Sequence, residues 1–318
     1  MSRAWLPLAA LLGLAAAALA NDSVAETAAG GLVLRQSRDI DMVSEDLYLS
    51  RLEVRVRYVF RNRSARPVRT IVAFPMPDRD LSAEEEGDIA WPADFRTRVD
   101  GRAVTMRVER KAMLGAVDHS ALLRSLGVPI AGRDRDPALY QALAALPRAA
   151  QARLERLGLI QGGRPQWTVK ETWYWEQAFP AGRDLAVEHR YRPGLGGTVM
   201  TALGSREVRE SDYGREAIAR YCVDADLVAT LERAARRGGS DYPAYAESWL
   251  SYVLTTGANW RSPIADFRLV VDKGDPRTLV SFCGQGVRRI SPTQFEMRRR
   301  NWRPTRDLHV LFLHPIGG

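Results

Sequence analysis

The residue types that most often do chemistry are few in this chain and stand far apart. The sequence has two cysteines and four histidines, at Cys222, Cys283, His119, His189, His309 and His314. No two histidines have the i, i+4 spacing that brings imidazoles together on a helix around a metal ion. No Gly-x-Ser-x-Gly segment supplies the nucleophile elbow of a hydrolase. From the sequence we assign no catalytic residue, no metal ligand and no cofactor.

Carboxylates occur in two patterns that are relevant to metal binding or acid–base catalysis. Four of them lie between residues 37 and 46 and could bind calcium, but the run lacks the central glycine of an EF-hand loop. A solvated acidic turn, paired with nearby arginines, is the simpler interpretation. Glu171 and Glu176 stand near tryptophans, as in many sugar sites, yet their odd spacing puts them on opposite faces of one strand. Neither pattern identifies an acid–base pair.

Two segments remain as candidate binding surfaces. An aromatic block at 173–175 could stack on a sugar or an apolar ligand, although packing in the core is the commoner role of such residues. An arginine-rich stretch at 288–306 could meet an anionic headgroup, a glycan or a partner protein. The alternative for that stretch is a solvated basic edge that discourages aggregation. The candidate binding residues are Trp173, Tyr174, Trp175, Arg298, Arg300 and Trp302.

The first twenty residues have the composition of a secretory signal peptide. Arg3 gives a positive start, an apolar run follows over residues 5–19, and small residues at 18 and 20 suit a signal peptidase. The run is too short and too rich in alanine for a membrane span. We expect cleavage between Ala20 and Asn21, and a soluble periplasmic protein with no transmembrane segment after the leader is removed.

Export bears on the cysteines and on the charge. In an oxidising compartment a lone pair of cysteines usually forms a bridge, so we expect a Cys222–Cys283 disulfide, with two separate buried thiols as the alternative.

The net charge is +8, and arginine supplies all of the positive charge except for three lysines. This bias is typical of a GC-rich genome, and an anion-binding surface is the alternative. Export argues against nucleic acid as a partner, whereas an anionic envelope surface remains open.

The N-terminal half has the patterning of antiparallel β-structure. Val54, Val56, Tyr58 and Phe60 alternate with charged residues, which predicts a half-buried strand. Strand-like segments flank Asp100-Gly101, a dipeptide that favours the type I′ turn of a β-hairpin. A further pair of strands is expected on either side of the turn at 180–182. We predict a mostly β, α+β protein whose residues 21–198 form an antiparallel β-sandwich.

Helical periodicity appears in two places. Between about 111 and 160 leucines recur at helical spacing, which predicts a helical insertion in the sandwich. After residue 198, Asp224 or Asp226 can cap a helix that ends at Gly238-Gly239, and strand-like runs follow to the C-terminus. Residues 199–318 are therefore expected to form a smaller α+β unit, either separate or sharing one core with the first.

Several segments taken together resemble an exported bacterial family catalogued as domain of unknown function 4424. The likeness covers essentially the whole mature chain and implies a β-rich periplasmic protein, but it brings no catalytic residues with it. Residues 53–191 are also similar, at the level of fold, to the domain that precedes von Willebrand A modules in inter-alpha-trypsin inhibitors (VIT-type domain). The helical insertion departs from that second pattern. The segments that carry the family likeness are 21–23, 31–34, 44–47, 54–60, Phe-Pro-Met-Pro at 74–77, 175–182, 189–193, 221–222 and Thr-Gly-Ala-Asn-Trp at 256–260.

Three functions are compatible with these observations. We favour a non-enzymatic periplasmic protein that binds a ligand or an envelope component. An envelope hydrolase acting on glycan or peptide is the first alternative, and two convergent carboxylates with perturbed pKa values in a pocket would support it. A carrier of apolar ligands is the second, and it predicts a large cavity lined by tryptophan and leucine.

Overall fold

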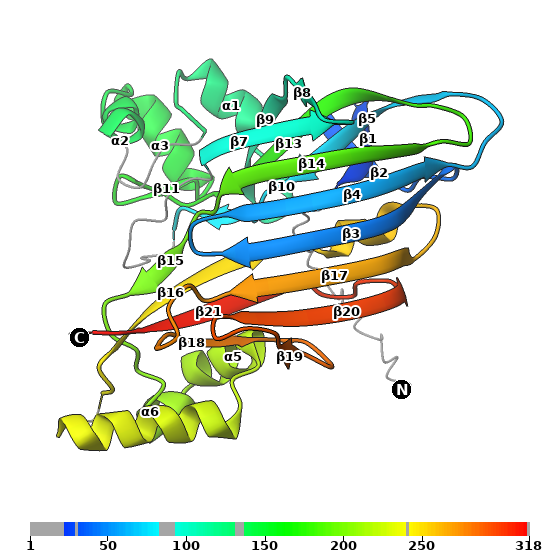
Figure 1. The fold of residues 1–318 in the computed structure, drawn as a ribbon. Coiled ribbons are helices and arrows are strands. Elements are labelled where there is room, and N and C mark those ends of the chain that lie inside the picture. Colours follow the sequence, from blue (N-terminus) through cyan, green and yellow to red (C-terminus); the bar gives the residue numbers. More distant parts are fainter. Residues whose placement is uncertain (1–21, 29–30, 83–92, 131–136, 240–241, 317–318) are drawn as a thin grey trace, which may run out of the picture.

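Alternation of apolar and charged residues builds the largest sheet of the fold. In β4 the side chains of Val54, Val56, Tyr58 and Phe60 are buried, as the sequence predicts. The computed structural model describes residues 22–28, 31–82, 93–130, 137–239 and 242–316. In it β4 lies within an eight-stranded sheet, in the order β19-β20-β17-β3-β4-β14-β7-β8 (Figure 1). Its strands are β3 (Ile40–Ser50), β4 (Val54–Asn62), β7 (Ala93–Val99), β8 (Arg102–Val104), β14 (Asp184–Arg192), β17 (Ile264–Asp272), β19 (Arg288–Arg289) and β20 (Gln294–Trp302).

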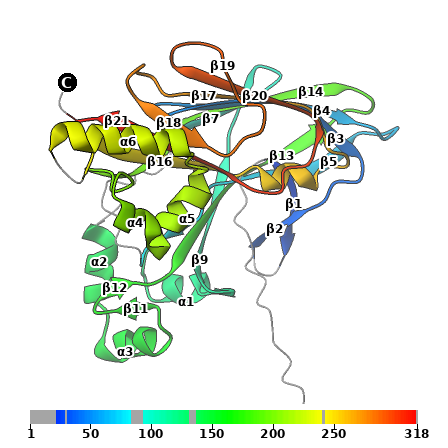
Figure 2. The ribbon, with the colours of Figure 1, turned by 90° about the horizontal axis from the view of Figure 1, so that it is seen from below.

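Two smaller sheets lie behind the large one. A seven-stranded sheet has the order β10-β9-β13-β5-β1-β2, with β6 also paired to β13, and a four-stranded sheet has the order β15-β16-β21-β18. Seen from below, both lie on the same side of the eight-stranded sheet (Figure 2). The strands are β1 (Ser23–Ala28), β2 (Gly31–Arg35), β5 (Val68–Pro75), β6 (Arg79–Asp80), β9 (Arg107–Leu114), β10 (Val117–Asp118), β13 (Thr168–Phe179), β15 (Gly196–Thr198), β16 (Tyr245–Tyr252), β18 (Leu279–Phe282) and β21 (Leu308–Pro315).

One hydrophobic cluster fills the space between these three sheets. Phe74 from the seven-stranded sheet and Tyr252 from the four-stranded sheet both pack in the cluster that holds Tyr58 of β4. The hydroxyl oxygens of Tyr58 and Tyr252 are 2.8 Å apart, which joins two sheets by a hydrogen bond inside the core. The expected β-rich α+β class is therefore confirmed.

A parallel strand pair connects the two ends of the chain. β17 pairs in parallel with β3, so strands from the last third of the sequence extend a sheet that begins near residue 40. The hydrophobic cluster likewise contains residues from before and after position 198. The division of the chain into two units at 198/199 stays a prediction. If there are two units, they share this hydrophobic cluster.

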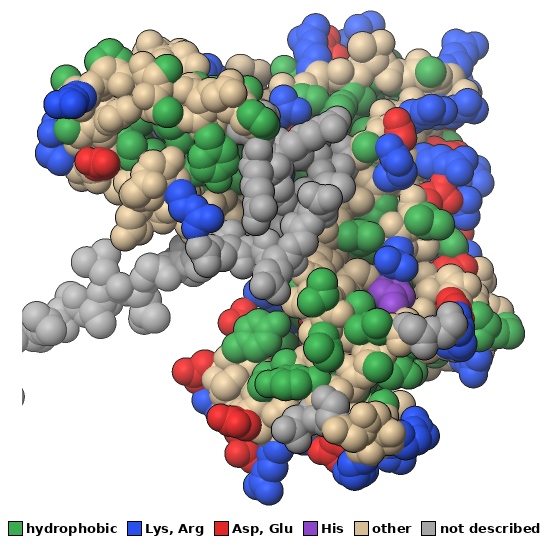
Figure 3. All heavy atoms as spheres, turned by 90° about the vertical axis from the view of Figure 1, so that its left-hand side faces the viewer, with side chains coloured by type: hydrophobic (Ala, Val, Ile, Leu, Met, Phe, Trp, Pro, Cys, Tyr) green, Lys and Arg blue, Asp and Glu red, His purple; other side chains and the backbone are tan. Residues whose placement is uncertain are grey.

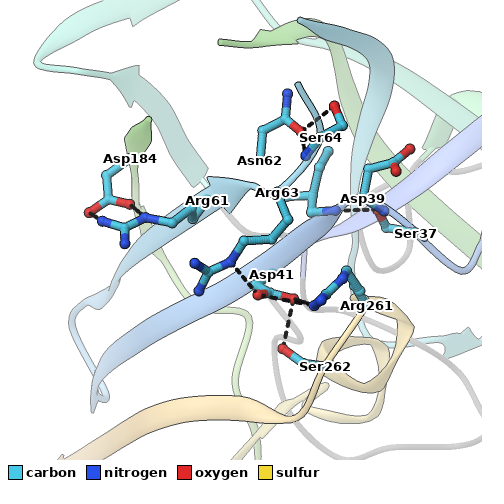
Figure 4. Close-up of polar contacts among 11 residues, drawn as sticks. Ser37, Asp39, Asp41, Arg61, Asn62, Arg63, Ser64, Asp184, Arg261 and Ser262 are labelled. Carbon is cyan, nitrogen blue, oxygen red and sulfur yellow. Dashed lines mark hydrogen bonds and ion pairs between the residues drawn. The ribbon is translucent and has the colours of Figure 1, made fainter. Parts of the chain in front are cut away.

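Tight turns form where the sequence predicts them. Asp100 and Gly101 have φ angles of 47° and 78°, and they connect β7 to β8 in a hairpin. Asn62 organises the turn after β4 through its buried amide, which donates to the carbonyl oxygens of Arg66 and Phe179, each at 2.9 Å. The carbonyl oxygen of the same side chain accepts from the backbone and hydroxyl of Ser64 (Figure 4).

Three helices form the insertion between β10 and β11. They are α1 (Ser120–Ser125), α2 (Pro137–Ala144) and α3 (Arg148–Arg156), followed by the short hairpin of β11 (Ile160–Gln161) and β12 (Arg164–Pro165). Leu123, Leu139, Leu143 and Leu154 pack around Trp167 in a second hydrophobic cluster. The helices begin at Ser120 rather than near 111, because residues 107–114 form β9 and pair with β13.

A second group of helices covers the outer face of the four-stranded sheet. It comprises α4 (Arg206–Glu210), α5 (Asp212–Tyr221) and α6 (Ala225–Gly238), and a 3-10 turn, η1 (Thr255–Asn259), follows β16. The Asp224 side chain accepts from the Leu227 amide at 2.8 Å, and the helix ends at Gly239 with φ 61°. Leu231 of α6 packs with Leu311 and Leu313 of β21, which holds these helices on the sheet.

The two cysteines form the expected disulfide. Cys222 directly follows α5 and Cys283 directly follows β18, and their Cα atoms are 5.0 Å apart. The bridge therefore ties the C-terminal end of α5 to the four-stranded sheet. Residues 1–20 and the expected cleavage between Ala20 and Asn21 lie outside the described residues. No helix within the described part of the chain has the length and apolar character needed to cross a membrane.

Candidate functional site

The aromatic block at 173–175 packs mainly into the interior. Trp175 is buried, and its indole nitrogen donates to Gln177 Oε1 at 3.0 Å. Trp173 stacks on Phe95, with ring centroids 4.9 Å apart. Tyr174 points to the opposite side of β13 and is half-buried. Since the two indoles support the core, only the Tyr174 side is open to a ligand, and the proposed binding role of the block stays a prediction.

The arginine-rich stretch forms a charge network on β20 rather than a free basic surface. Glu296, which is almost fully buried, accepts hydrogen bonds from Arg268 at 2.8 Å, from Arg298 at 3.2 Å, and from Arg288. These three guanidinium groups lower the pKa of Glu296 to about 2. The Trp302 ring packs against Phe267, with ring centroids 4.6 Å apart.

This network continues across the solvent face of the eight-stranded sheet. Basic and acidic side chains lie close together along the right-hand edge of Figure 3, which is that face. Arg61 pairs with Asp184 across β4 and β14, and Arg268 pairs with Asp46 across β17 and β3. Arg300 makes no ion pair within the part of the chain that the structure describes. The aromatic block and the arginine stretch lie on different sheets, so the fold does not unite them in one site.

The acidic run at 37–46 is a strand rather than a turn from Ile40 onward. Asp41 accepts from Arg63 at 2.7 Å, from Arg261 at 3.1 Å and from Ser262 at 2.9 Å (Figure 4). Partial burial would raise the pKa of Asp41, but hydrogen bonds from Arg63 and Ser262 and the charge of Arg261 lower it overall. Among the described residues, no group of three or more His, Cys, Asp or Glu is placed to hold a metal ion.

A buried acid–imidazole–hydroxyl chain lies in the core. Asp22 Oδ1 is 3.0 Å from His189 Nε2, and Thr97 Oγ1 is 2.8 Å from His189 Nδ1. The aromatic rings of Phe74 and Trp175 lie against the imidazole, and all three polar residues are buried. Because these three residues are buried, no substrate can reach them in this structure. We therefore interpret their hydrogen bonds as a structural element of the core.

A candidate ligand site is a pocket between α5 and the outer face of the four-stranded sheet, called here the α5 pocket. It has a volume of about 450 Å³, within the range of small-molecule sites. Figure 3 shows apolar side chains gathered on the lower part of the molecule, over the region of α4–α6 and this sheet. The pocket is lined by Thr198, Leu203, Tyr213, Glu216, Ala217, Arg220, Tyr221, Glu247, Trp249 and Leu311.

Helical periodicity explains one wall of the α5 pocket. The lining residues of α5 lie at positions 213, 216, 217, 220 and 221, which is the i, i+3, i+4, i+7, i+8 spacing of a single helix face. Ser211 caps the helix by accepting from the Gly214 amide at 3.2 Å. At the other end the disulfide follows Tyr221, and Ser281 Oγ donates to the Tyr221 carbonyl at 2.9 Å. Both ends of this wall are therefore held in place.

Strand alternation explains the opposite wall. In β16, Glu247 and Trp249 point toward α5, whereas Leu250 and Tyr252 point into the central core. β15 pairs with this strand, with Gly196 opposite Trp249. A Cβ atom on Gly196 would lie 2.1 Å from the indole nitrogen, so only glycine lets the indole lie against β15.

Burial governs the ionisation of the groups in the α5 pocket. It raises the pKa of Glu247, and a hydrogen bond from the Thr201 hydroxyl opposes that rise. Burial also raises the pKa of Tyr221 to about 12. Arg220 forms an ion pair with Glu216 one helical turn away, at 2.9 Å.

None of the residues lining the α5 pocket belongs to the binding surfaces that the sequence suggested. Its walls come from segments up to about a hundred residues apart in the chain, so only the fold brings them together. Two signals were nevertheless present in the sequence. One is the spacing of Tyr213, Ala217, Arg220 and Tyr221 on one face of a helix, and the other is the alternation of acidic and aromatic residues in 245–249.

The fold and the pocket define a β-rich α+β protein with a small, partly enclosed cavity beside a disulfide-anchored helix. The family model for Domain of unknown function (DUF4424) matches residues 20–311, and the chain belongs to this family. No curated protein matches the chain.

Two solved structures are similar in parts of their fold. One is a protein from Legionella pneumophila whose suggested role is nutrient binding, with 16% identity, a TM-score of 0.45, and coverage of 88% of this chain and 68% of that one. The other is an M1 zinc metallopeptidase from Deinococcus radiodurans, with 10% identity, a TM-score of 0.27, and coverage of 88% of this chain and 43% of that one. At these scores neither likeness carries a functional argument.

Proposed function

We propose that this chain is a non-enzymatic binding protein of the bacterial envelope and that the α5 pocket is its ligand site. The observation that supports this most directly is a cavity of about 450 Å³ with aromatic walls and one half-buried carboxyl group, that of Glu247. Apolar and aromatic walls with a few polar groups are the usual composition of small-molecule sites. The ligand is a small molecule that contacts Trp249, Tyr213 and Tyr221.

The polar groups of the α5 pocket favour binding over covalent chemistry. Its lining residues, as the structure describes them, include no serine, cysteine or histidine. Arg220 and Glu216 are engaged with each other, and Glu247 is engaged with Thr201.

One observation favours a second candidate, an envelope hydrolase acting on glycan or peptide. Glu216 and Glu247 line the same pocket, and the pKa of Glu247 is raised by burial, as suits a general acid. The third candidate, a carrier of apolar ligands, is less well supported because charged residues line the pocket alongside Leu203 and Leu311.

The proposed location is the periplasm, with cleavage after Ala20. The leader-like composition of residues 1–20 and the Cys222–Cys283 bridge support it, because disulfides persist in oxidising compartments. Contact with an anionic envelope surface through Arg298, Arg300 and their neighbours stays part of the proposal, although Arg298 is already paired with Glu296. The VIT-type likeness of 53–191 also stays a proposal.

The decisive test is native mass spectrometry of the protein taken directly from a periplasmic extract. We expect a co-purifying small molecule on the wild type, none on Trp249→Ala, and retention on Trp302→Ala, which removes an indole outside the pocket. Thermal unfolding checks that both variants fold. Equal occupancy of wild type and Trp249→Ala would contradict the proposed site. Cleavage of peptidoglycan or peptide that is lost in Glu247→Gln would instead establish the hydrolase.

A further inference from the structure

The carboxyl group of Glu247 is the feature of the α5 pocket that most needs a partner. It is largely buried, and among the described residues it makes no ion pair. Within the described part of the chain, its one hydrogen bond comes from the neutral hydroxyl of Thr201. Removing a carboxylate from water costs free energy unless an opposite charge or several donors replace the water. A ligand that carries a positive charge supplies what the protein does not.

The aromatic residues of the pocket add to this preference. Tyr213 and Tyr221 come from α5 and Trp249 comes from β16, so rings approach the cavity from two sides. The face of an aromatic ring carries negative electrostatic potential and attracts a cation within about 6 Å of its centre. Rings together with a carboxylate form a recognised receptor for alkylated ammonium groups.

The other charged groups near the α5 pocket do not oppose a cation. On α5, Arg220 is paired with Glu216 at 2.9 Å, so their charges largely cancel. On β21, His309 has its pKa lowered by burial and by the charge of Arg220, and is therefore neutral at pH 7. With that pair neutralised and the imidazole uncharged, the carboxyl group of Glu247 sets the charge of the pocket, and a bound cation favours its ionised form.

Several hydrogen-bonding groups in and beside the pocket are already engaged within the protein, and the carboxyl group of Glu247 disfavours an anion. Thr198 Oγ1 donates to the Met200 carbonyl at 3.1 Å, and Thr201 and Arg220 are already engaged. A polyhydroxylated ligand would need several free donors and acceptors, whereas methyl groups need none. Leu203 and Leu311 complete an apolar lining for such methyl groups.

We infer that the α5 pocket binds a small organic cation, a quaternary or methylated ammonium, with its charge beside Glu247 and its methyl groups against the rings of Tyr213, Tyr221 and Trp249. This inference rests on the proposed binding function and names the ligand class for the same site. The ligand contributes the positive charge that the protein leaves out, and desolvation of Glu247 is offset only when the site is filled.

The test is calorimetric titration with choline chloride and with 3,3-dimethylbutan-1-ol, its neutral isostere in which carbon replaces the charged nitrogen. We expect the wild type to bind choline about tenfold or more tightly than the alcohol, a difference of about 1.4 kcal/mol. Glu247→Gln should weaken choline binding severalfold, leaving only the preference that the rings supply, and should leave binding of the alcohol unchanged. Glu207→Gln, which removes an exposed carboxylate of α4 outside the pocket, should bind choline like the wild type.

The outcomes separate this inference from the proposed function. Equal binding of choline and the alcohol would show that the pocket selects by shape alone, which overturns the cation inference and leaves the binding function intact. Failure of choline to bind, together with a co-purifying molecule in native mass spectrometry, would also overturn the inference only. Absence of any bound molecule by either method would overturn both.

Discussion

The indole of Trp249 occupies the space that a side chain on residue 196 would need. A Cβ atom at Gly196 would lie 2.1 Å from the indole nitrogen and 2.4 Å from the adjacent ring carbon. The same indole lines the α5 pocket. Because Gly196 has no side chain, the indole of Trp249 can lie against β15, and in that position it forms one wall of the α5 pocket.

Gly196→Ala is expected to displace the indole and impair binding. The added methyl group cannot be accommodated without movement of Trp249, so we expect loss of bound ligand and a stability cost of about 1–3 kcal/mol from overpacking. Ligand occupancy and chemical denaturation measure the two effects. Gly238→Ala is the matched control, since a Cβ there meets nothing within 4 Å. Unchanged occupancy in Gly196→Ala would show that this wall does not contact the ligand.

Thr201→Val should shift the pH dependence of ligand binding. Valine removes the hydroxyl that donates to Glu247, and a donor favours the charged form of a carboxyl group. Loss of the donor raises the pKa of Glu247 further, so binding of a cation should fail at a higher pH than in the wild type as the solution is acidified. Titrations of choline at several pH values measure the midpoint. If the pH midpoint of choline binding did not move, ionisation of Glu247 would not control binding.

The disulfide should stabilise both the fold and the pocket. Cys222 and Cys283 are 61 residues apart in sequence, and closing a loop of that length contributes roughly 4 kcal/mol in the chain-entropy account. Cys222→Ser/Cys283→Ser should therefore unfold at lower denaturant concentration and bind ligand more weakly, because the bridge holds one end of α5. The measurement compares the denaturant midpoints of the oxidised and the reduced wild type. Two free thiols in protein isolated from the periplasm would contradict the oxidised form.

The charge network around Glu296 should make stability depend on pH. Its pKa in the folded protein is about 2, below the ordinary value of 4.5, so its contribution to stability is complete above pH 4.5 and is lost as the pH falls toward 2. Glu296→Gln should cost about 1–2 kcal/mol at pH 7, because three partly exposed arginines lose their shared carboxylate. The difference between wild type and variant should shrink below pH 4.5. A difference that is constant with pH would assign the loss to packing.

Local patterns predicted the elements whose causes are local. The alternation of 54–60 predicted β4, Asp100-Gly101 predicted a hairpin, and Asp224 or Asp226 with Gly238-Gly239 predicted the two ends of α6, where the structure has Asp224 and Gly239 as the caps. β9 was expected to be helical in part, because its charged residues obscure the alternation and its strand partner β13 begins more than fifty residues later. Long-range pairing determines such a strand.

The candidate site could not be predicted from the sequence, because it too depends on contacts between segments that are distant in the chain. The sequence left the aromatic block either in the core or on a binding surface, because Phe95, on which Trp173 stacks, lies far away in the chain. Likewise Arg298 shares Glu296, its neighbour on β20, with Arg268 of the adjacent strand β17, and only the pairing of the two strands shows this. The α5 pocket depends on β15, β16, β21 and α5 together, and no one of these segments contains enough of it to be recognised.

The parallel pairing of β3 with β17 has a consequence for the timing of folding. Asp46 of β3 faces Arg268 of β17, more than two hundred residues later in the chain. Pairings between such distant segments form slowly, because a long loop must close before any contact compensates the lost entropy. One edge of β3 therefore stays unpaired until β17 has been synthesised, and the central sheet is completed late in folding.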